Sequence, residues 1–306
     1  MNTLVFGGNG FIGSHLVDEL MQAGHSVRVF DRLPERFRFP RPGVDYRSGH
    51  FGDAFSMAEA LQDIEVVYHL ISTTVPGTSN LNPVADISDN LIATVVLLEQ
   101  MAKVGVKRIV YLSSGGTVYG NPINLPIAED HPLHPICSYG VVKVAVENYL
   151  AMYQELYGIH PTIIRPSNPF GPRQGHLGVQ GVIATFLARI YDNQPLNVWG
   201  DGSIVRDYIA ATDLVRLCRI VGELSIGGVF NAGSGRGISI SDLIAVLIEV
   251  TGRQTEVAFE PSRKLDVKEV VLDISHATSS AGWSPSTDFA EEVDRHWRWY
   301  SSLREL

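Results

Sequence analysis

The chain has 306 residues, of which 45% are hydrophobic and 19% charged, and its formal net charge at pH 7 is −9. This negative charge argues against nucleic acids and anionic membranes as partners. Two cysteines are too few for a disulfide framework and favour a reducing, cytoplasmic setting. No uninterrupted apolar segment is long enough to span a bilayer, and glycines interrupt the N-terminal apolar run, so that run is predicted to be a strand and not a signal peptide.

The N-terminal segment has the pattern of a strand, a helix and a second strand. The apolar run 4–6 leads into closely spaced glycines, a helical pattern continues to Gly24, and the strand 27–30 ends at Asp31. Such glycines allow a tight turn, a close approach of backbone N–H groups to a pyrophosphate, and packing of the helix on the strand. The cofactor contacts predicted here are Gly7, Gly10, Phe11, Ile12, Gly13, Asp31 and Arg32.

Asp31 indicates which dinucleotide is preferred. Its carboxylate can accept hydrogen bonds from the ribose hydroxyls of the adenosine, and it would repel a 2′-phosphate. This favours NAD over NADP, although the adjacent Arg32 weakens the preference.

The following segments alternate between strand and helix patterns. Strands are predicted at 44–47, 66–70, 108–112 and 161–165, and helices at 56–62, 83–104 and 139–157. The polar segments 72–80 and 113–120 follow strands, so they are expected at the carboxyl edge of a parallel sheet, where ligands bind. The alternation predicts a doubly wound α/β fold, with a parallel-sheet Rossmann domain.

Beyond residue 168 the chain is richer in prolines and glycines, which predicts a smaller C-terminal α/β substrate domain. We therefore expect an NAD-binding domain over 1–168 and a mainly substrate-binding domain over 169–306. Segments near 205–232, namely 206–209 and 229–231, are expected to return to the main sheet. A final helix over 288–300 carries Phe289, Val293, Trp297 and Tyr300 on one face.

Tyr139 and Lys143 are the predicted catalytic pair. They are four residues apart and share one face of a helix. A free tyrosine titrates near ~10 and is a poor base at neutral pH, but a nearby ammonium or an oxidised nicotinamide stabilises the phenolate. Lys143 could also hold the nicotinamide ribose. By itself the pair could be a tyrosine at a helix N-terminus with a solvated lysine, but it follows a glycine-rich nucleotide loop and a Ser-Ser strand end in the expected order along the chain.

Together these motifs resemble the extended short-chain dehydrogenases/reductases, in the NAD-dependent epimerase/dehydratase family and its UDP-glucose 4-epimerase-like branch. The resemblance covers nearly the whole chain. Its further motifs are Asn90, Ser113–Gly120, Asn168, Trp199–Gly202, Arg206–Tyr208, Asn231–Ser234 and Arg263-x-x-Asp266.

The resemblance implies a tightly held NAD and 4-epimerisation of a UDP-hexose or UDP-N-acetylhexosamine. The tyrosinate removes the 4-hydroxyl proton, hydride leaves C4, the transient 4-keto sugar turns over, and hydride returns to its other face. The pathway implied is surface-polysaccharide or galactose metabolism. The helices 83–104 and 139–157 often form a homodimer interface in this family.

The resemblance also implies roles for individual residues. Further cofactor contacts would be Asp53, Leu70, Asn90, Ser113, Tyr139, Lys143 and Pro166. Substrate contacts would be Asn168, Arg206, Arg263, Asp266 and Val270. A guanidinium suits phosphate oxygens, although Arg206 could instead form a salt bridge with Asp207. Val270 matches a position where a bulky side chain excludes 2-acetamido sugars. Valine leaves room there, so the resemblance allows an N-acetylhexosamine substrate.

The chain departs from the family pattern at three places. His50 stands where an Asp normally holds the adenine amino group, and Asp53 matches a later acid of that motif. Gly115 stands at the usual catalytic Ser/Thr, so Ser114 or Thr117 would have to replace it, with Ser114 favoured. Gly116 and Thr117 replace the acids of dehydratases and decarboxylases, which disfavours both reactions.

Two alternatives remain open. One is a nucleotide-sugar 4-ketoreductase or dehydrogenase. The other is a non-catalytic NAD-binding regulator, which the glycine at position 115 would permit. No metal site is expected, because His131 and His134 lack a third ligand nearby, and Cys137 is expected to be a packed thiol.

Overall fold

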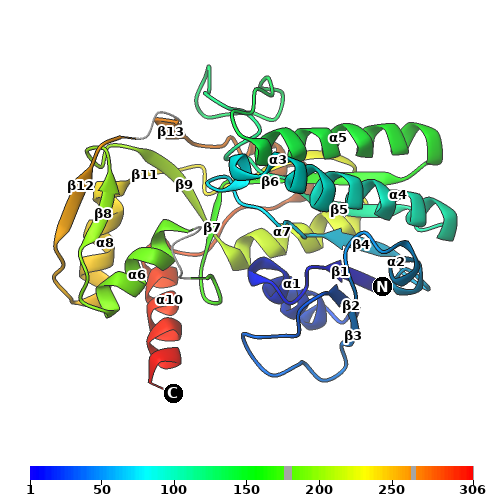
Figure 1. Ribbon diagram of the computed structural model, residues 1–306, viewed down its shortest axis with the longest axis horizontal. Helices are drawn as coiled ribbons and strands as arrows, with labels where there is room; N and C mark the ends of the chain where they lie inside the picture. Colours follow the sequence, from blue (N-terminus) through cyan, green and yellow to red (C-terminus); the bar gives the residue numbers. More distant parts are fainter. Residues whose placement is uncertain (176–180, 263–266, 306) are drawn as a thin grey trace.

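The computed structural model describes residues 1–175, 181–262 and 267–305, and its largest element is a seven-stranded sheet (Figure 1). The strand order is β3-β2-β1-β4-β5-β6-β10, and every neighbouring pair is parallel. Its strands are β1 (Asn2–Phe6), β2 (Ser26–Asp31), β3 (Asp45–Ser48), β4 (Val66–His69), β5 (Arg108–Leu112), β6 (His160–Pro166) and β10 (Gly228–Ala232). Each predicted strand of the first 165 residues lies in this sheet.

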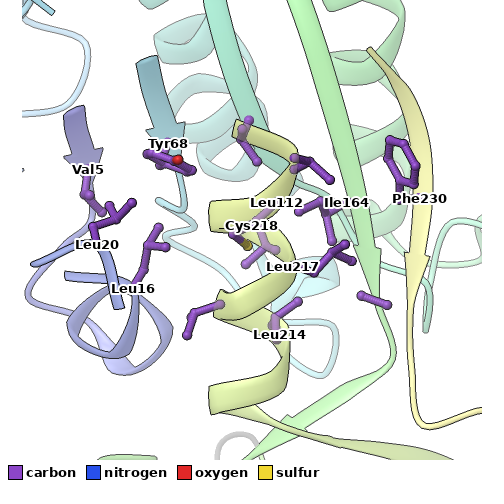
Figure 2. Packing of buried hydrophobic residues seen from close by; sticks show 14 of the residues in the cluster. Val5, Leu16, Leu20, Tyr68, Leu112, Ile164, Leu214, Leu217, Cys218 and Phe230 are labelled. Carbon is purple, nitrogen blue, oxygen red and sulfur yellow. The ribbon is translucent and has the colours of Figure 1, made fainter. Parts of the chain in front are cut away.

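Helices cover both faces of the sheet, which explains its nearly continuous apolar strands. On one face α1 (Phe11–Gln22) and α7 (Ala211–Leu224) pack on residues such as Val5; Figure 2 shows Leu214, Leu217 and Cys218 of α7 in this cluster. On the other face α2 (Ala54–Ala60), α4 (Ala93–Val104) and α5 (Ser138–Tyr157) pack on Leu4 and Phe6.

The segment predicted as one helix over 83–104 is divided. It comprises α3 (Pro83–Asp86), the π-helical turn η2 (Ile87–Ile92) and α4, after a short 3₁₀ turn, η1 (Ser79–Leu81). The Asn90 amide donates to the backbone oxygen of Asp86 at 3.1 Å. A side chain that occupies an i−4 carbonyl competes with the regular helical ladder, so a wide turn at Asn90 has a local cause.

The C-terminal part contains a second, smaller core. The strands β7 (Asn168–Phe170), β9 (Val205–Ala210), β11 (Gly237–Ser239) and β13 (Glu269–Val270) form one small sheet, and β8 (Leu196–Trp199) pairs with β12 (Val257–Glu260). The helices of this part are α6 (Val182–Tyr191), α8 (Ile240–Thr251), α9 (Ser275–Ala281) and α10 (Phe289–Arg304). Val293 is fully buried, Phe289 and Trp297 pack against the same cluster, and Tyr300 is buried, so the predicted apolar face of the last helix is confirmed.

The expectation that 205–232 returns to the main sheet is only partly right. β10 pairs with β6 as expected, and α7 packs against α1. The strand at 206–209, however, is part of β9, which pairs with β7, β11 and β13 and not with the main sheet. A buried apolar run reveals a strand but not its partner. Within the residues described, no helix is both long and apolar enough to cross a membrane.

Candidate active site

The glycine turn after β1 fits a dinucleotide. Gly7 has φ +83°, and the N–H of Gly10 donates to the Gly7 oxygen at 3.1 Å. A Cβ on Gly13 would lie 2.0 Å from that oxygen, so only glycine allows the helix to approach the strand this closely. The turn borders a pocket of about 200 Å³, whose lining includes Gly7, Gly10, Asp31, Arg32, Arg36, His50, Leu70, Ser72 and Thr73.

Asp31 is fixed at the rim of this cofactor pocket. Its two carboxylate oxygens accept backbone N–H groups of Asn9 and Leu33, each at 3.1 Å. The carboxylate is thereby held where ribose hydroxyls could donate to it. Arg32 is exposed and lines the same pocket.

Asp53 and His50 differ in their position relative to the cofactor pocket. Asp53 is the N-cap of α2, where its carboxylate accepts the Ser56 N–H at 3.1 Å, and these hydrogen bonds hold its pKa below the usual value. Asp53 does not belong to the lining of the cofactor pocket, whereas His50 does. The predicted cofactor contact Asp53 thus has a local capping function here.

Lys143 is buried at the carboxyl end of β5. Its Nζ donates to the Leu112 oxygen at 2.7 Å and lies 5.5 Å from the centre of the Tyr139 ring. Burial lowers the pKa of Lys143 to about 8, against the opposing effect of the Glu147 and Asp86 carboxylates. The predicted pair is therefore brought together on the first turns of α5.

The pKa of Tyr139 differs from expectation. Lys143 was expected to lower it, but burial raises it well above the ordinary value, the Cys137 thiol adds to the rise, and hydrogen bonds with the hydroxyls of Ser72 and Ser114 oppose it. The ammonium of Lys143 is directed to a backbone oxygen and to the Tyr111 ring, 4.7 Å from its centre. In this chain alone the phenol is protonated at neutral pH.

The backbone explains why position 115 carries glycine. Its N–H donates to the Pro166 oxygen at 2.7 Å, and a Cβ would lie 2.6 Å from Leu272 Cδ1 and 2.9 Å from the Arg165 oxygen. A serine or threonine does not fit this conformation. The hydroxyl of the neighbouring Ser114 is instead hydrogen-bonded with Tyr139, and its catalytic role stays a prediction. Thr117 Oγ1 is buried without a hydrogen-bond partner among the described residues.

A polar cluster surrounds Asn90 beside Tyr139. The Asn90 side chain accepts the Thr73 N–H at 2.8 Å and donates to Asp86 Oδ1 at 2.9 Å. The buried Asp86 carboxylate also accepts the Ser138 hydroxyl at 2.7 Å. Sequence reasoning did not single out Asp86 or Ser72, although the polar run 72–80 at a strand end indicated this edge.

A second polar network is centred on Glu147, one helical turn after Lys143 on α5. Arg165 Nη2 lies 2.6 Å from Glu147 Oε2, and the Ser113 hydroxyl donates to Glu147 Oε1. Tyr119 accepts from Arg165 Nη1 at 3.0 Å and donates to Asn231 Oδ1 at 2.7 Å. Ser113, predicted to contact the cofactor, thus has its hydroxyl engaged in this network. An arginine inside the apolar run of β6 was the available signal for it.

The substrate-side residues lie mainly around β9. Asn168 Nδ2 donates to the Asp207 backbone oxygen at 2.9 Å, and half-buried Arg206 is in register with Val270 of β13. Val270 is buried with Val118, Ile127 and Leu272. The predicted contacts Arg263 and Asp266 lie outside the described residues.

Asp207 organises the loops around this region. Its carboxylate accepts the N–H and the hydroxyl of Ser234, each at 2.7 Å, and the Leu272 N–H at 3.3 Å. Burial raises its pKa, and these donors oppose the rise. The carboxylate therefore connects β9 to the segments after β10 and β13.

Comparison with known proteins agrees with this fold. The model of the NAD dependent epimerase/dehydratase family matches residues 3–233, and the chain belongs to this family. Its cofactor is accordingly NAD, and its fold is the doubly wound Rossmann sheet with a C-terminal domain.

Named relatives lie within the same family. The chain is 35% identical to a UDP-glucose 4-epimerase of Mycolicibacterium smegmatis over 308 residues, 96% of each chain. It resembles the Thermotoga maritima UDP-glucose 4-epimerase solved with UDP-glucose, at TM-score 0.93 and 34% identity over 99% of this chain and 100% of that one. It also resembles a UDP-N-acetylglucosamine 4-epimerase of Methanobrevibacter ruminantium, solved with UDP-N-acetylmuramic acid, at TM-score 0.93 and 27% identity over 99% and 98% of the two chains.

Proposed function

We propose that the protein catalyses NAD-dependent 4-epimerisation of a UDP-hexose or UDP-N-acetylhexosamine through a transient 4-keto intermediate. The observation that carries this proposal is the hydrogen bonding of Tyr139 with the Ser114 and Ser72 hydroxyls, beside the pocket of the glycine turn. Relatives with this activity support it.

In this proposal Tyr139 takes the proton of the sugar 4-hydroxyl and returns it. Ser114 shares that proton through its hydrogen bond with the phenolic oxygen, and Lys143 holds the nicotinamide ribose. Gly7, Gly10, Phe11, Ile12, Gly13, Asp31, Leu70 and Pro166 would surround the dinucleotide. When bound, NAD supplies a hydride acceptor and a positive charge. That charge favours the phenolate, which burial disfavours in the protein alone.

The substrate end of the proposal rests on Asn168, Arg206, Arg263 and Asp266 for the nucleotide diphosphate. Val270 is small and fully covered, so it places no bulk near the sugar. We infer that a 2-acetamido group is tolerated, and the Methanobrevibacter ruminantium relative supports this inference. Residues 1–168 would then bind mainly NAD, and 169–306 mainly the nucleotide sugar.

The test is incubation of the purified protein, without added cofactor, with UDP-galactose, UDP-GalNAc and their gluco epimers, with products resolved by NMR. Interconversion of either pair is expected, and the faster pair identifies the preferred sugar. Tyr139→Phe should lower turnover at least about 10³-fold. Tyr149→Phe, which changes a partly exposed tyrosine of the same helix, is the matched control.

Other outcomes would favour the alternatives. Stoichiometric consumption of NADH or NADPH with a 4-keto sugar would indicate a reductase. Absence of any interconversion with NAD added, together with no effect of Tyr139→Phe, would indicate a non-catalytic NAD-binding regulator.

We also infer a cytoplasmic homodimer. The outer faces of α3–α4 and α5 expose a set of apolar side chains: Val84, Ile92, Val141, Met152 and Leu156, each at least 41% exposed. Figure 1 shows α4 and α5 side by side, and their residues are in contact. A second copy would bury this face as a four-helix bundle. Light scattering should give twice the chain mass, and Met152→Glu should give monomers.

A further inference from the structure

A second pocket, of about 430 Å³, shares no lining residue with the cofactor pocket. It is bordered by α1, the turn after β7, the start of α7, and α10. Its charged and polar lining includes Asp18, Glu19, Arg173, Thr212, Arg295 and Arg298. The pocket thus lies between α1, which follows the glycine turn, and three later segments: the turn after β7, the start of α7, and α10.

The acids of this pocket already have cationic partners. Asp18 accepts from Arg173 Nη2 at 2.8 Å and from Arg41 at 2.9 Å, and it also pairs with Arg38. Glu19 lies 2.7 Å from Arg219 Nε. The lining itself holds three arginines, Arg173, Arg295 and Arg298, against these two acids, which gives it a formal charge of +1 on a chain of net charge −9.

The other charged groups facing the pocket do not reverse this sign. Burial, followed by the nearby Arg173, lowers the pKa of His15 to about 4, so His15 is neutral at pH 7. Arg295 Nη1 lies 2.9 Å from the buried Glu292, and Arg298 Nη2 lies 2.7 Å from Asp294. Burial raises the pKa of Glu292 to about 7, so its negative charge is only partial at neutral pH.

Two donors in the lining have no acceptor. Arg173 Nη1 and Thr212 Oγ1 are buried and make no hydrogen bond within 1–175, 181–262 and 267–305. A buried donor without a partner destabilises the folded state, so such groups normally bind a ligand or water. Both residues line the pocket, and a small rotation of either side chain would bring its donor to a bound oxyanion.

We propose that this pocket binds the phosphate group of a small metabolite. Arg173 Nη1 and Thr212 Oγ1 donate to its oxygens, and Arg298 and Arg295 add positive charge. A guanidinium is suited to phosphate through its planar set of donors. The bound phosphate would tie α1 and α10 to the turn after β7.

The test uses the protein saturated with NAD and UDP, so that the phosphate positions of the active site are filled. Inorganic phosphate is titrated at constant ionic strength, with calorimetry and the melting temperature as readouts. Saturable binding and a rise in melting temperature are expected. Arg298→Gln should weaken binding about tenfold, because it removes one charge-assisted contact. Arg304→Gln, on the same helix but outside the pocket lining, should leave the affinity unchanged.

Thr212→Val is the second variant, since it removes one donor with almost no change in shape, and it should also weaken phosphate binding. A parallel titration with glucose 6-phosphate separates two sources: tighter binding than phosphate identifies a sugar phosphate, and equal binding identifies free phosphate. Absence of saturable binding, or equal affinities in the wild type, Arg298→Gln and Thr212→Val, would overturn the proposal.

Discussion

Two buried carboxylates show how differently one chain treats the same chemical group. Glu147, 7% exposed, accepts from Arg165 Nε at 3.1 Å and Nη2 at 2.6 Å and from the Ser113 hydroxyl. Glu292, fully buried, receives no hydrogen bond within the described residues, although Arg295 Nη1 lies 2.9 Å away. Burial raises the pKa of Glu292 to about 7. Both carboxylates are buried, so the hydrogen bonds that each one receives, and not burial, distinguish the paired Glu147 from Glu292.

The largest expected loss of stability follows from removing the charge of Glu147. Glu147→Gln leaves Arg165 buried without a counter-charge and should lower the free energy of unfolding by about 3–5 kcal/mol. Urea denaturation measures this loss, with Glu155→Gln, an exposed change on the same helix, as the control. Equal stability of the two variants would remove the distinction between the two carboxylates.

Glu292→Gln should instead raise the free energy of unfolding at neutral and basic pH. Its folded pKa is above the ordinary 4.5, so the unfolded chain releases its proton first and wild-type stability falls as pH rises from about 4.5 to 7. The variant should lack this fall, so its free energy of unfolding relative to the wild type should rise by roughly 3 kcal/mol between pH 4.5 and pH 8. Denaturation at both pH values measures it, and exposed Glu291→Gln should follow the wild type. A variant with the wild-type pH profile would contradict the raised pKa.

A smaller loss of stability is expected from steric crowding beside the Glu147–Arg165 network. Gly115→Ala places a Cβ 2.9 Å from the Arg165 oxygen and should lower the free energy of unfolding by about 1–3 kcal/mol. Gly116→Ala is the control, since its Cβ meets nothing within 4 Å. Equal melting temperatures for both would show that this backbone yields easily.

The smallest effect is expected at an exposed carboxylate. Asp53→Ala removes the N-cap of α2 and should lower the melting temperature by about 2–4 °C. NAD affinity, measured by calorimetry, should stay unchanged, because Asp53 is outside the pocket lining. A large loss of affinity would instead restore Asp53 as a cofactor contact.

Much of the fold could be predicted because its signals are local. The glycine turn, the strand 108–112 and the start of α5 near Tyr139 follow from short patterns of glycine spacing and apolar periodicity. The pairing of β9 could not be predicted, because strand partners depend on contacts far apart in sequence. The π-helical turn at Asn90 was missed for a related reason, since a stripe of apolar residues does not report a local change of helical pitch.

The site was predictable by residue type more than by environment. Tyr139, Lys143 and Ser114 could be singled out from spacing and order along the chain. The raised pKa of Tyr139, the capping function of Asp53 and the Glu147–Arg165 pair depend on burial and on hydrogen-bond direction. These properties arise only when the elements pack, and a sequence without coordinates does not contain them explicitly.

The wide turn η2 also marks where the helix length could change. A π-helical turn contains one residue more than the α-helical turn it replaces. Deleting one residue from Ile87–Ile92 would therefore restore regular α-helical winding and leave α3 and α4 on nearly the same faces, because four α-helical residues turn through about the same angle as five π-helical ones. The wide turn that holds the Asn90 amide would be lost, while the outer faces of α3 and α4 would keep their places. The extra residue thus serves the polar interior of this helix without shifting its apolar exterior.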